Sequence, residues 1–141
     1  MAIRKANAEW NGGLKDGKGQ VKLGSGAYEG PYSFESRFEE GSGTNPEELI
    51  GAAHAGCYSM ALSAALEEAG YTPESVKTEA HVSLVKDGEG FAINKIKLVA
   101  NARIPDISEE DFDKHAQGAK ENCPVSKALS ATDIELDATL M

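Results

Sequence analysis

Alternating apolar and polar positions predict β-structure at the start of the chain. Residues 3–10 are expected to form a strand, and residues 20–23 a second strand that returns beside it. The segment between them, residues 11–19, is rich in glycine and lysine, which is typical of a turn. This pattern indicates a β-hairpin.

The segment from Tyr32 to Phe38 continues the alternation and is predicted to be a further strand. In an extended segment every second side chain points to the same face. Tyr32, Phe34, Ser36 and Phe38 would share one face, with Ser33, Glu35 and Arg37 on the other. Residues 41–44 are expected to form a loop.

A long helix is predicted over residues 46–69. Asn45 suits the N-cap, Pro46 suits the first helical position, and the two glutamates that follow place carboxylates in the positive first turn. Gly70 is a typical residue after a helix, and Pro73 prevents its continuation. These signals define both ends of the helix.

Two strands are predicted next, over residues 75–85 and 91–103, joined by a hairpin loop at residues 86–90. Ser108 suits the N-cap of a second helix. Its expected core face repeats at helical spacing and consists of Phe112, Ala116 and Ala119.

The end of the chain is predicted to hold a short helix and a final strand. Pro124 begins the helix, which reaches to about Leu129, and the strand alternates through Ile134, Leu136 and Ala138. Strands and helices are segregated rather than regularly alternating, which indicates an α+β fold. With 141 residues and no linker or repeat, the chain is expected to be one domain over residues 1–141.

The long helix is apolar on all sides and is therefore expected to be buried in the centre of the protein. Gly51 with Ala55, and Ala52 with Gly56, form small pairs that would let another helix approach closely. One sheet covers one face of such a helix, so the second face needs another partner. A homodimer in which two copies of this helix pack together would cover it, as would the second helix of a monomer.

Charge and composition limit the partners. The formal net charge is −9, and binding to nucleic acid or to an anionic membrane needs clustered cations. Residues 49–66 carry no formal charge over a length near that of a membrane span, but they are rich in alanine and glycine, and glutamates flank both sides. We expect no nucleic acid and no membrane as partners. The N-terminus resembles no signal peptide, so a cytoplasmic protein is expected.

Cys57 is one candidate for chemistry. It lies in the middle of the long helix, three residues after His54 and on roughly the same face. A buried cysteine often serves only as a small apolar residue. Cys57 is also too far from the start of the helix for the helix dipole to hold a thiolate, so a reactive Cys57 would need a cation from elsewhere.

Cys123 is the second candidate. Pro124 follows it, which predicts that Cys123 is the N-cap of the short helix. A thiol in that position has a lowered pKa, because free N–H groups face it. Cys123 is therefore expected to be the easier thiolate of the two, although a loop cysteine without a role is an equally simple interpretation.

His54, Cys57 and Cys123 together allow two further interpretations. Three ligands could hold zinc, but a structural zinc site needs four, and no metal is expected. A Cys57–His54 dyad for acyl transfer would need an orienting third group. A buried His54 bonded to the backbone or to a hydroxyl is favoured over both.

Three stretches resemble one known family. Residues 44–63, TNPEELIGAAHAGCYSMALS, resemble the central helix of the OsmC/Ohr family, and residues 122–129, NCPVSKAL, its second cysteine motif. Residues 32–38, ending Ser-Arg-Phe, resemble its arginine strand. The spacing favours the osmotically inducible OsmC branch over the organic hydroperoxide resistance branch.

The resemblance implies a fold and an activity. The fold would be α+β, with an antiparallel sheet packed on a long central buried helix in an intertwined homodimer. The activity would be that of a cytoplasmic thiol-dependent peroxidase that needs no cofactor. It would reduce organic hydroperoxides and, less readily, hydrogen peroxide, and a dithiol, possibly of the lipoyl type, would reduce it again.

The same resemblance assigns roles to four residues. Cys57 would be the peroxidatic cysteine and Cys123 the resolving cysteine, and the two would form a disulfide. Arg37 and Glu47 would be the charged pair beside the reactive thiol. Arg37 would supply the cation that the helix dipole cannot, and Glu47 would orient its guanidinium. A redox sensor or binding protein that forms the same disulfide without turnover is the alternative.

Overall fold

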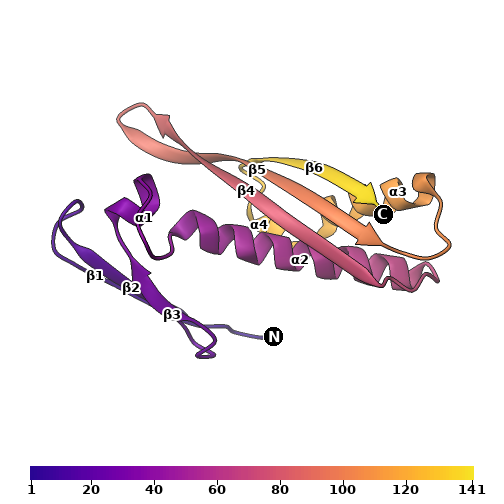
Figure 1. Ribbon diagram of the computed structural model, residues 1–141, viewed down its shortest axis with the longest axis horizontal. Coiled ribbons are helices and arrows are strands. Elements are labelled where there is room, and N and C mark those ends of the chain that lie inside the picture. Colours follow the sequence, from indigo (N-terminus) through magenta and orange to yellow (C-terminus); the bar gives the residue numbers. More distant parts are fainter. The chain divides into compact units, whose positions relative to one another are not determined.

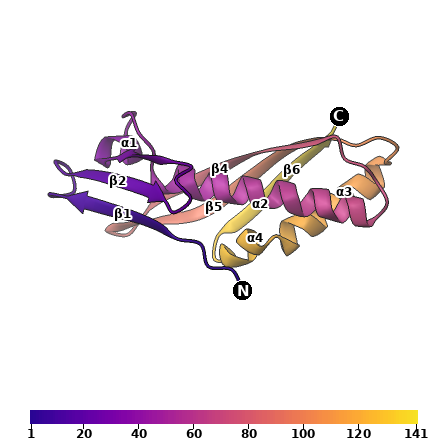
Figure 2. The same ribbon diagram turned by 90° about the horizontal axis from the view of Figure 1, so that it is seen from below.

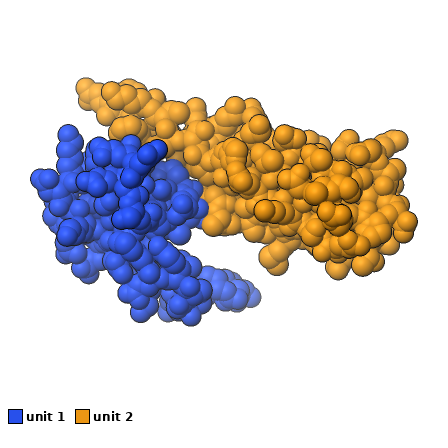
Figure 3. Space-filling view, in the orientation of Figure 1, with its two compact units in different colours: residues 1–49 blue, residues 50–141 orange.

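The computed structural model describes residues 1–141, which form two compact units (Figure 3). The first unit spans residues 1–49 and the second residues 50–141. The boundary falls just after the first turn of the long helix. Whether residues 1–141 act as one domain stays a prediction.

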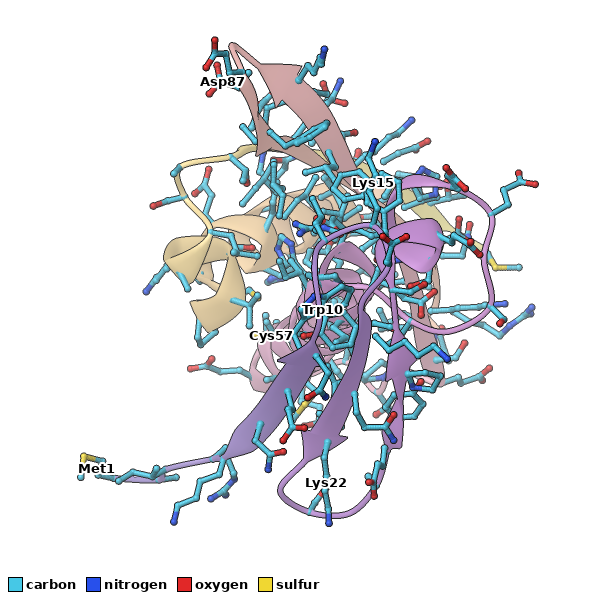
Figure 4. The ribbon with its side chains drawn as sticks, turned by 90° about the vertical axis from the view of Figure 1, so that its left-hand side faces the viewer. Met1, Trp10, Lys15, Lys22, Cys57 and Asp87 are labelled. Carbon is cyan, nitrogen blue, oxygen red and sulfur yellow. The ribbon has the colours of Figure 1, made fainter.

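The first unit contains a three-stranded antiparallel sheet in the order β1-β2-β3. Its strands are β1 (Ala6–Asn11), β2 (Lys18–Leu23) and β3 (Glu29–Tyr32). The predicted hairpin of the first two strands is confirmed, and β3 was not expected. Gly19 on β2 pairs with Trp10 and with Tyr32, and a Cβ atom at Gly19 would collide with both rings. The rings instead pack on each other, with centroids 5.3 Å apart (Trp10 is labelled in Figure 4).

The predicted strand over residues 32–38 is wrong, because residues Phe34–Phe38 form a short helix, α1. Ser33 is its N-cap and makes a reciprocal capping box with Ser36. Phe34 and Phe38 are neighbours at i and i+4, and their ring centroids lie 4.9 Å apart. In so short a segment the same apolar residues fit both the two-residue period of a strand and one turn of a helix. The hydrogen bonds between the capping serines favour the helix.

The long helix, α2 (Pro46–Glu68), has the predicted start and ends one residue earlier than expected. The Asn45 side chain accepts a hydrogen bond from the backbone N–H of Glu48 at 2.7 Å, so the predicted N-cap is confirmed. Gly70 has a φ of +94°, the left-handed conformation that favours glycine after a helix.

The second unit contains a mixed sheet in the order β4-β5-β6 (Figure 1). Its strands are β4 (Ser75–Asp87), β5 (Gly90–Arg103) and β6 (Asp133–Leu140). The first two form the predicted hairpin, with Asp87 paired to Gly90. The expected antiparallel sheet is wrong for β6, which pairs parallel to β5. Two helices connect β5 to β6, and such a crossover returns the chain in the same direction.

Those two helices are α3 (Glu109–Asn122) and α4 (Pro124–Ala128), and both were predicted. Ser108 caps α3 by accepting a hydrogen bond from the backbone N–H of Asp111 at 3.1 Å. The predicted core face of α3 is buried. With α2, the two helices lie on one face of the sheet (Figures 1 and 2).

The core of the second unit lies between α2, α3 and β5. Its fully buried large side chains include Tyr58, Leu62 and Leu66 from α2, Ile96 and Leu98 from β5, and Phe112 from α3. The Tyr58 hydroxyl donates a hydrogen bond to the Ala116 carbonyl at 3.1 Å, which connects α2 to α3. The α2 helix is thereby held against the crossover that carries Cys123.

The α2 helix is not buried on all sides in the single chain, so the face that was expected to need a second partner is exposed. Its buried positions are Glu47, Gly51, His54, Tyr58, Leu62 and Leu66. Its exposed face is formed by Ala52, Ala53, Gly56, Met60 and Ala64. By length and composition alone α2 could also cross a membrane, but a core helix of a soluble protein passes the same test. One side of an apolar helix therefore lacks cover in the single chain.

Candidate active site

The structure brings the two cysteines into contact. Cys57 lies in the middle of α2, and Cys123 lies between α3 and α4, where it is the C-cap of one helix and the N-cap of the other. Their Sγ atoms are 2.8 Å apart, although 66 positions separate them in the sequence. Both thiols are free, with Cys123 buried and Cys57 partly exposed. Two reduced sulfurs at this separation are ready to form a disulfide with little movement.

The surroundings of the two sulfurs shift their pKa values in opposite directions. Burial, followed by the contact with Cys123, raises the pKa of Cys57. Burial also acts to raise the pKa of Cys123, but the contact with Cys57, the N–H groups of Ser126 and Val125 and the Ser126 hydroxyl lower it overall. Within the second unit Cys123 is therefore the easier thiolate, in agreement with the sequence prediction.

His54 is fully buried and contacts a hydroxyl rather than either cysteine. Its Nε2 lies 2.7 Å from the Oγ of Ser126, which is on α4. The favoured interpretation of His54 is thus confirmed. The Cys57–His54 dyad is wrong, since the imidazole bonds elsewhere. No group of three or more potential metal ligands lies together in the structure.

Arg37 and Glu47 form a bidentate salt bridge in the first unit. The Arg37 Nη2 lies 2.7 Å from the Glu47 Oε1, and the Arg37 Nε donates to the two carboxylate oxygens at 3.1 and 3.3 Å. The Glu47 side chain is 10% exposed and that of Arg37 is 35% exposed. The guanidinium is therefore fixed in orientation while one side of it stays accessible.

Short-range contacts hold this salt bridge in place. The buried Ser36 hydroxyl donates to the Thr44 carbonyl at 2.7 Å, and the Asn45 side-chain amide donates to the Ser36 carbonyl at 2.9 Å. Asn45 therefore caps α2 and fastens α1 at the same time. Arg37 on α1 is set against Glu47 in the first turn of α2.

A pocket of about 230 Å³ adjoins Arg37 within the first unit. Its walls are mostly aromatic and apolar, and they consist of Trp10, Leu14, Tyr32, Ser33, Phe34, Arg37 and Phe38. The Arg37 guanidinium carbon also lies 5.4 Å from the centre of the Phe38 ring. The pocket combines apolar walls with one cation, which suits a small molecule with an apolar body and a polar end.

The four predicted site residues are thus brought together as two pairs, one in each unit. Sequence reasoning missed Ser126 and the aromatic pocket. Ser126 is in the second cysteine motif, three positions after Cys123, and that spacing at a helix start could have indicated it. The pocket depends on α1 being a helix, so the predicted strand concealed it.

Comparison with known proteins identifies the family. The chain is 53% identical over 138 residues to Peroxiredoxin OsmC of Escherichia coli, covering 97% of this chain and 96% of that protein. It is 32% identical to the organic hydroperoxide resistance protein OhrB of Bacillus subtilis, over 97% of this chain and 98% of that protein. The crystal structure of that OhrB superposes with a TM-score of 0.76, at 29% identity and over 96% and 98% of the two chains. The family profile described as OsmC-like protein matches residues 39–137, and the chain belongs to this family.

Proposed function

We propose that this protein is a cysteine-based peroxidase that reduces organic hydroperoxides and, less readily, hydrogen peroxide. The observation that carries the proposal is the contact between the Cys57 and Cys123 sulfurs at 2.8 Å in a member of the OsmC-like family. The names of the relatives, a peroxiredoxin and an organic hydroperoxide resistance protein, support it.

The reaction has three balanced steps. The Cys57 thiolate attacks one peroxide oxygen and the O–O bond breaks, so that Cys57 becomes a sulfenic acid, and the departing alkoxide takes up the proton that the thiol released and leaves as an alcohol. The Cys123 sulfur then attacks the Cys57 sulfur, the S–O bond breaks, and water leaves as the disulfide forms. An external dithiol finally reduces the disulfide by two thiol–disulfide exchanges and becomes a disulfide itself. A lipoyl-type dithiol is the proposed reductant.

Arg37 and Glu47 complete the peroxide-binding part of the site. Burial and the neighbouring Cys123 raise the pKa of Cys57, so its attack needs a nearby cation. Arg37 provides it, stabilises the thiolate and holds the leaving alkoxide. Glu47 fixes the guanidinium through the bidentate bridge. The aromatic pocket beside Arg37 takes the apolar part of the organic hydroperoxide.

The proposed active form is an intertwined homodimer. The exposed apolar face of α2, which includes Met60 at 75% exposure, gives each copy a surface to bury. Gly56 lies on that face, and a Cβ atom at this position would meet nothing within 4 Å, so a second α2 could approach closely. Each Cys57 would then meet an Arg37–Glu47 pair from its own chain or from the second copy. The protein is proposed to be soluble and to act as a single domain. It is proposed to be cytoplasmic, because its thiols must be kept reduced.

Steady-state consumption of cumene hydroperoxide with dihydrolipoamide as reductant tests the proposal. The wild-type protein is expected to turn over, Cys57→Ser to consume no peroxide above background, and Cys123→Ser to react once and accumulate a sulfenic acid on Cys57. Wild-type protein that forms the disulfide after one equivalent of peroxide but shows no turnover with any dithiol would instead be a redox sensor. Sulfenic acid on Cys123 in Cys57→Ser, formed at the wild-type rate, would reverse the two roles.

A further inference from the structure

His54 has a buried ring nitrogen with no partner. Its side chain is fully buried in α2, where its Nε2 lies 2.7 Å from the Ser126 Oγ and its Nδ1 makes no hydrogen bond. Burial lowers the pKa of His54, so the ring is neutral and carries one N–H. None of the three peroxidase steps uses this residue.

The contacts of His54 determine which nitrogen carries that hydrogen. A buried N–H without an acceptor is rarer and less favourable than a bare acceptor atom. The hydrogen is therefore on Nε2, and Nδ1 carries the lone pair. It follows that Nε2 donates to the Ser126 oxygen, which leaves the hydroxyl hydrogen of Ser126 free to point at another acceptor.

Cys123 is placed to accept a hydrogen bond from the Ser126 hydroxyl, because the two residues lie one turn apart at the start of α4. Ser126 is three positions after Cys123 in the first turn of α4, and both side chains are buried. The Ser126 hydroxyl and backbone N–H are among the groups that lower the pKa of Cys123. The Cys123 sulfur touches that of Cys57 and His54 touches Ser126, so a bond from the Ser126 hydroxyl to Cys123 would complete a path from His54 to Cys57.

We propose that His54 and Ser126 are positioning residues for the disulfide half of the reaction: the imidazole holds the Ser126 hydroxyl so that it donates to Cys123 and keeps that sulfur a thiolate aimed at Cys57. This rests on the proposed function. As the Cys123 thiolate attacks, the S–S bond forms and the S–O bond of the sulfenic acid breaks. The departing hydroxide takes up the proton that Cys123 released, and leaves as water.

The same path selects the sulfur that the reductant attacks. In thiol–disulfide exchange the sulfur with the lower pKa is the better leaving group. Ser126 stabilises Cys123 as a thiolate, so an incoming dithiol is expected to bond to Cys57 and release Cys123. The mixed disulfide with the reductant therefore forms on Cys57.

Paired variants test the path. Ser126→Ala removes the hydroxyl and Ser126→Thr keeps it. His54→Gln keeps an N–H near the position of Nε2, whereas His54→Asn reaches only the position of Nδ1. Ser130→Ala, the same change at an exposed serine just after α4, is the matched control. In each variant, quenched-flow measurements follow sulfenic acid formation and disulfide formation separately after one equivalent of cumene hydroperoxide.

Ser126→Ala and His54→Asn are expected to slow disulfide formation about tenfold, with sulfenic acid accumulating, while Ser126→Thr, His54→Gln and Ser130→Ala stay near wild type. In a Cys57→Ser background, Ser126→Ala should raise the pH midpoint of Cys123 alkylation by about one unit. An unchanged midpoint would overturn the proposal, as would equal rates in Ser126→Ala and Ser126→Thr. The alkylation measurement needs no peroxide, so it decides on the path even if wild-type protein proves not to be a peroxidase.

Discussion

Arg37 and Glu47 are ten positions apart in the sequence, whereas Cys57 and Cys123 are 66 apart, and the two pairs are built in different ways. The salt bridge is held by a short helix, a loop and the first turn of α2, through serine and asparagine contacts within a few residues. Local capping chemistry is sufficient to form it.

The thiol pair depends instead on the core of the second unit. Cys57 and Cys123 meet only because α2, α3 and β5 pack together, with Tyr58 bonded to the Ala116 carbonyl. This difference implies that the salt bridge, the proposed peroxide-binding part of the site, tolerates loss of core packing better than the thiol pair does. The following predictions test that difference, from the largest expected effect to the smallest.

Leu62→Ala is expected to separate the two parts most clearly. Leu62 is fully buried, and truncating such a leucine destabilises a protein by about 2–5 kcal/mol. Disulfide formation should slow, because α2 and the α3–α4 turn lose their common support, while peroxide still oxidises Cys57. Urea unfolding and quenched-flow kinetics measure both effects. Ile3→Ala, at a site that is 69% exposed, is the control, and an equal loss of the two reaction steps would contradict the comparison.

Arg37→Ala is expected to slow the first reaction step roughly 100- to 1,000-fold, as loss of a group that stabilises the leaving oxygen does. Arg37→Lys should recover only part of the rate, since an ammonium lacks the bidentate fork. The pH midpoint of Cys57 alkylation should rise in Arg37→Ala, and an unchanged midpoint would show that Arg37 is not the partner of Cys57.

Mixed dimers of Arg37→Ala and Cys57→Ser chains sharpen this test. If Arg37 serves the second copy, each mixed dimer regains one complete site and about half of the wild-type activity. If it serves its own chain, the mixture stays inactive.

Gly56→Leu is expected to weaken assembly by about 1–3 kcal/mol, because a large side chain would disturb a close contact between two α2 helices. In a single chain the same change meets only open space and should be tolerated. Analytical ultracentrifugation at micromolar concentration shows whether the substitution weakens the dimer or is tolerated. A wild-type protein that is monomeric and fully active would refute the proposed dimer.

Asn45→Ala is expected to destabilise the fold by about 0.5–2 kcal/mol, since it removes the α2 cap and the bond to the Ser36 carbonyl together. Asn45→Asp keeps the capping oxygen but loses that second bond. Both variants should slow peroxide attack, because Arg37 is no longer held in place. Only Asn45→Ala should also lose most of the stability that the helix cap contributes. Thermal unfolding and single-turnover rates distinguish them.

The smallest expected effect is a dependence of stability on pH through His54. Burial lowers its pKa in the folded protein, so below about pH 6.5 the unfolded chain binds a proton that the folded protein does not. Stability should therefore be retained above that pH and decline as the pH falls toward the folded pKa. Urea unfolding between pH 5 and 8 measures the decline, and His54→Gln should flatten it. A decline of equal slope in both proteins would assign it to other groups.

Several features followed from the sequence alone because their signals are local. Asn45 and Pro46 define the start of α2, Gly70 defines its end, and Ser108 caps α3. The cysteine motifs indicated the family, and the identity to Peroxiredoxin OsmC and the family profile confirmed it. Caps, turns and long motifs are read over a few neighbouring residues, so no tertiary contact can conceal them.

Other features were decided by the tertiary structure. Phe34 to Phe38 fit a strand as well as a helical turn, and the bond of Ser36 to the carbonyl of Thr44, eight positions away, favours the helix. The direction of β6 follows from the crossover through α3 and α4. The sulfur contact and the His54–Ser126 bond join residues 66 and 72 positions apart. Such contacts form only when the core closes, because no local interaction brings their partners together.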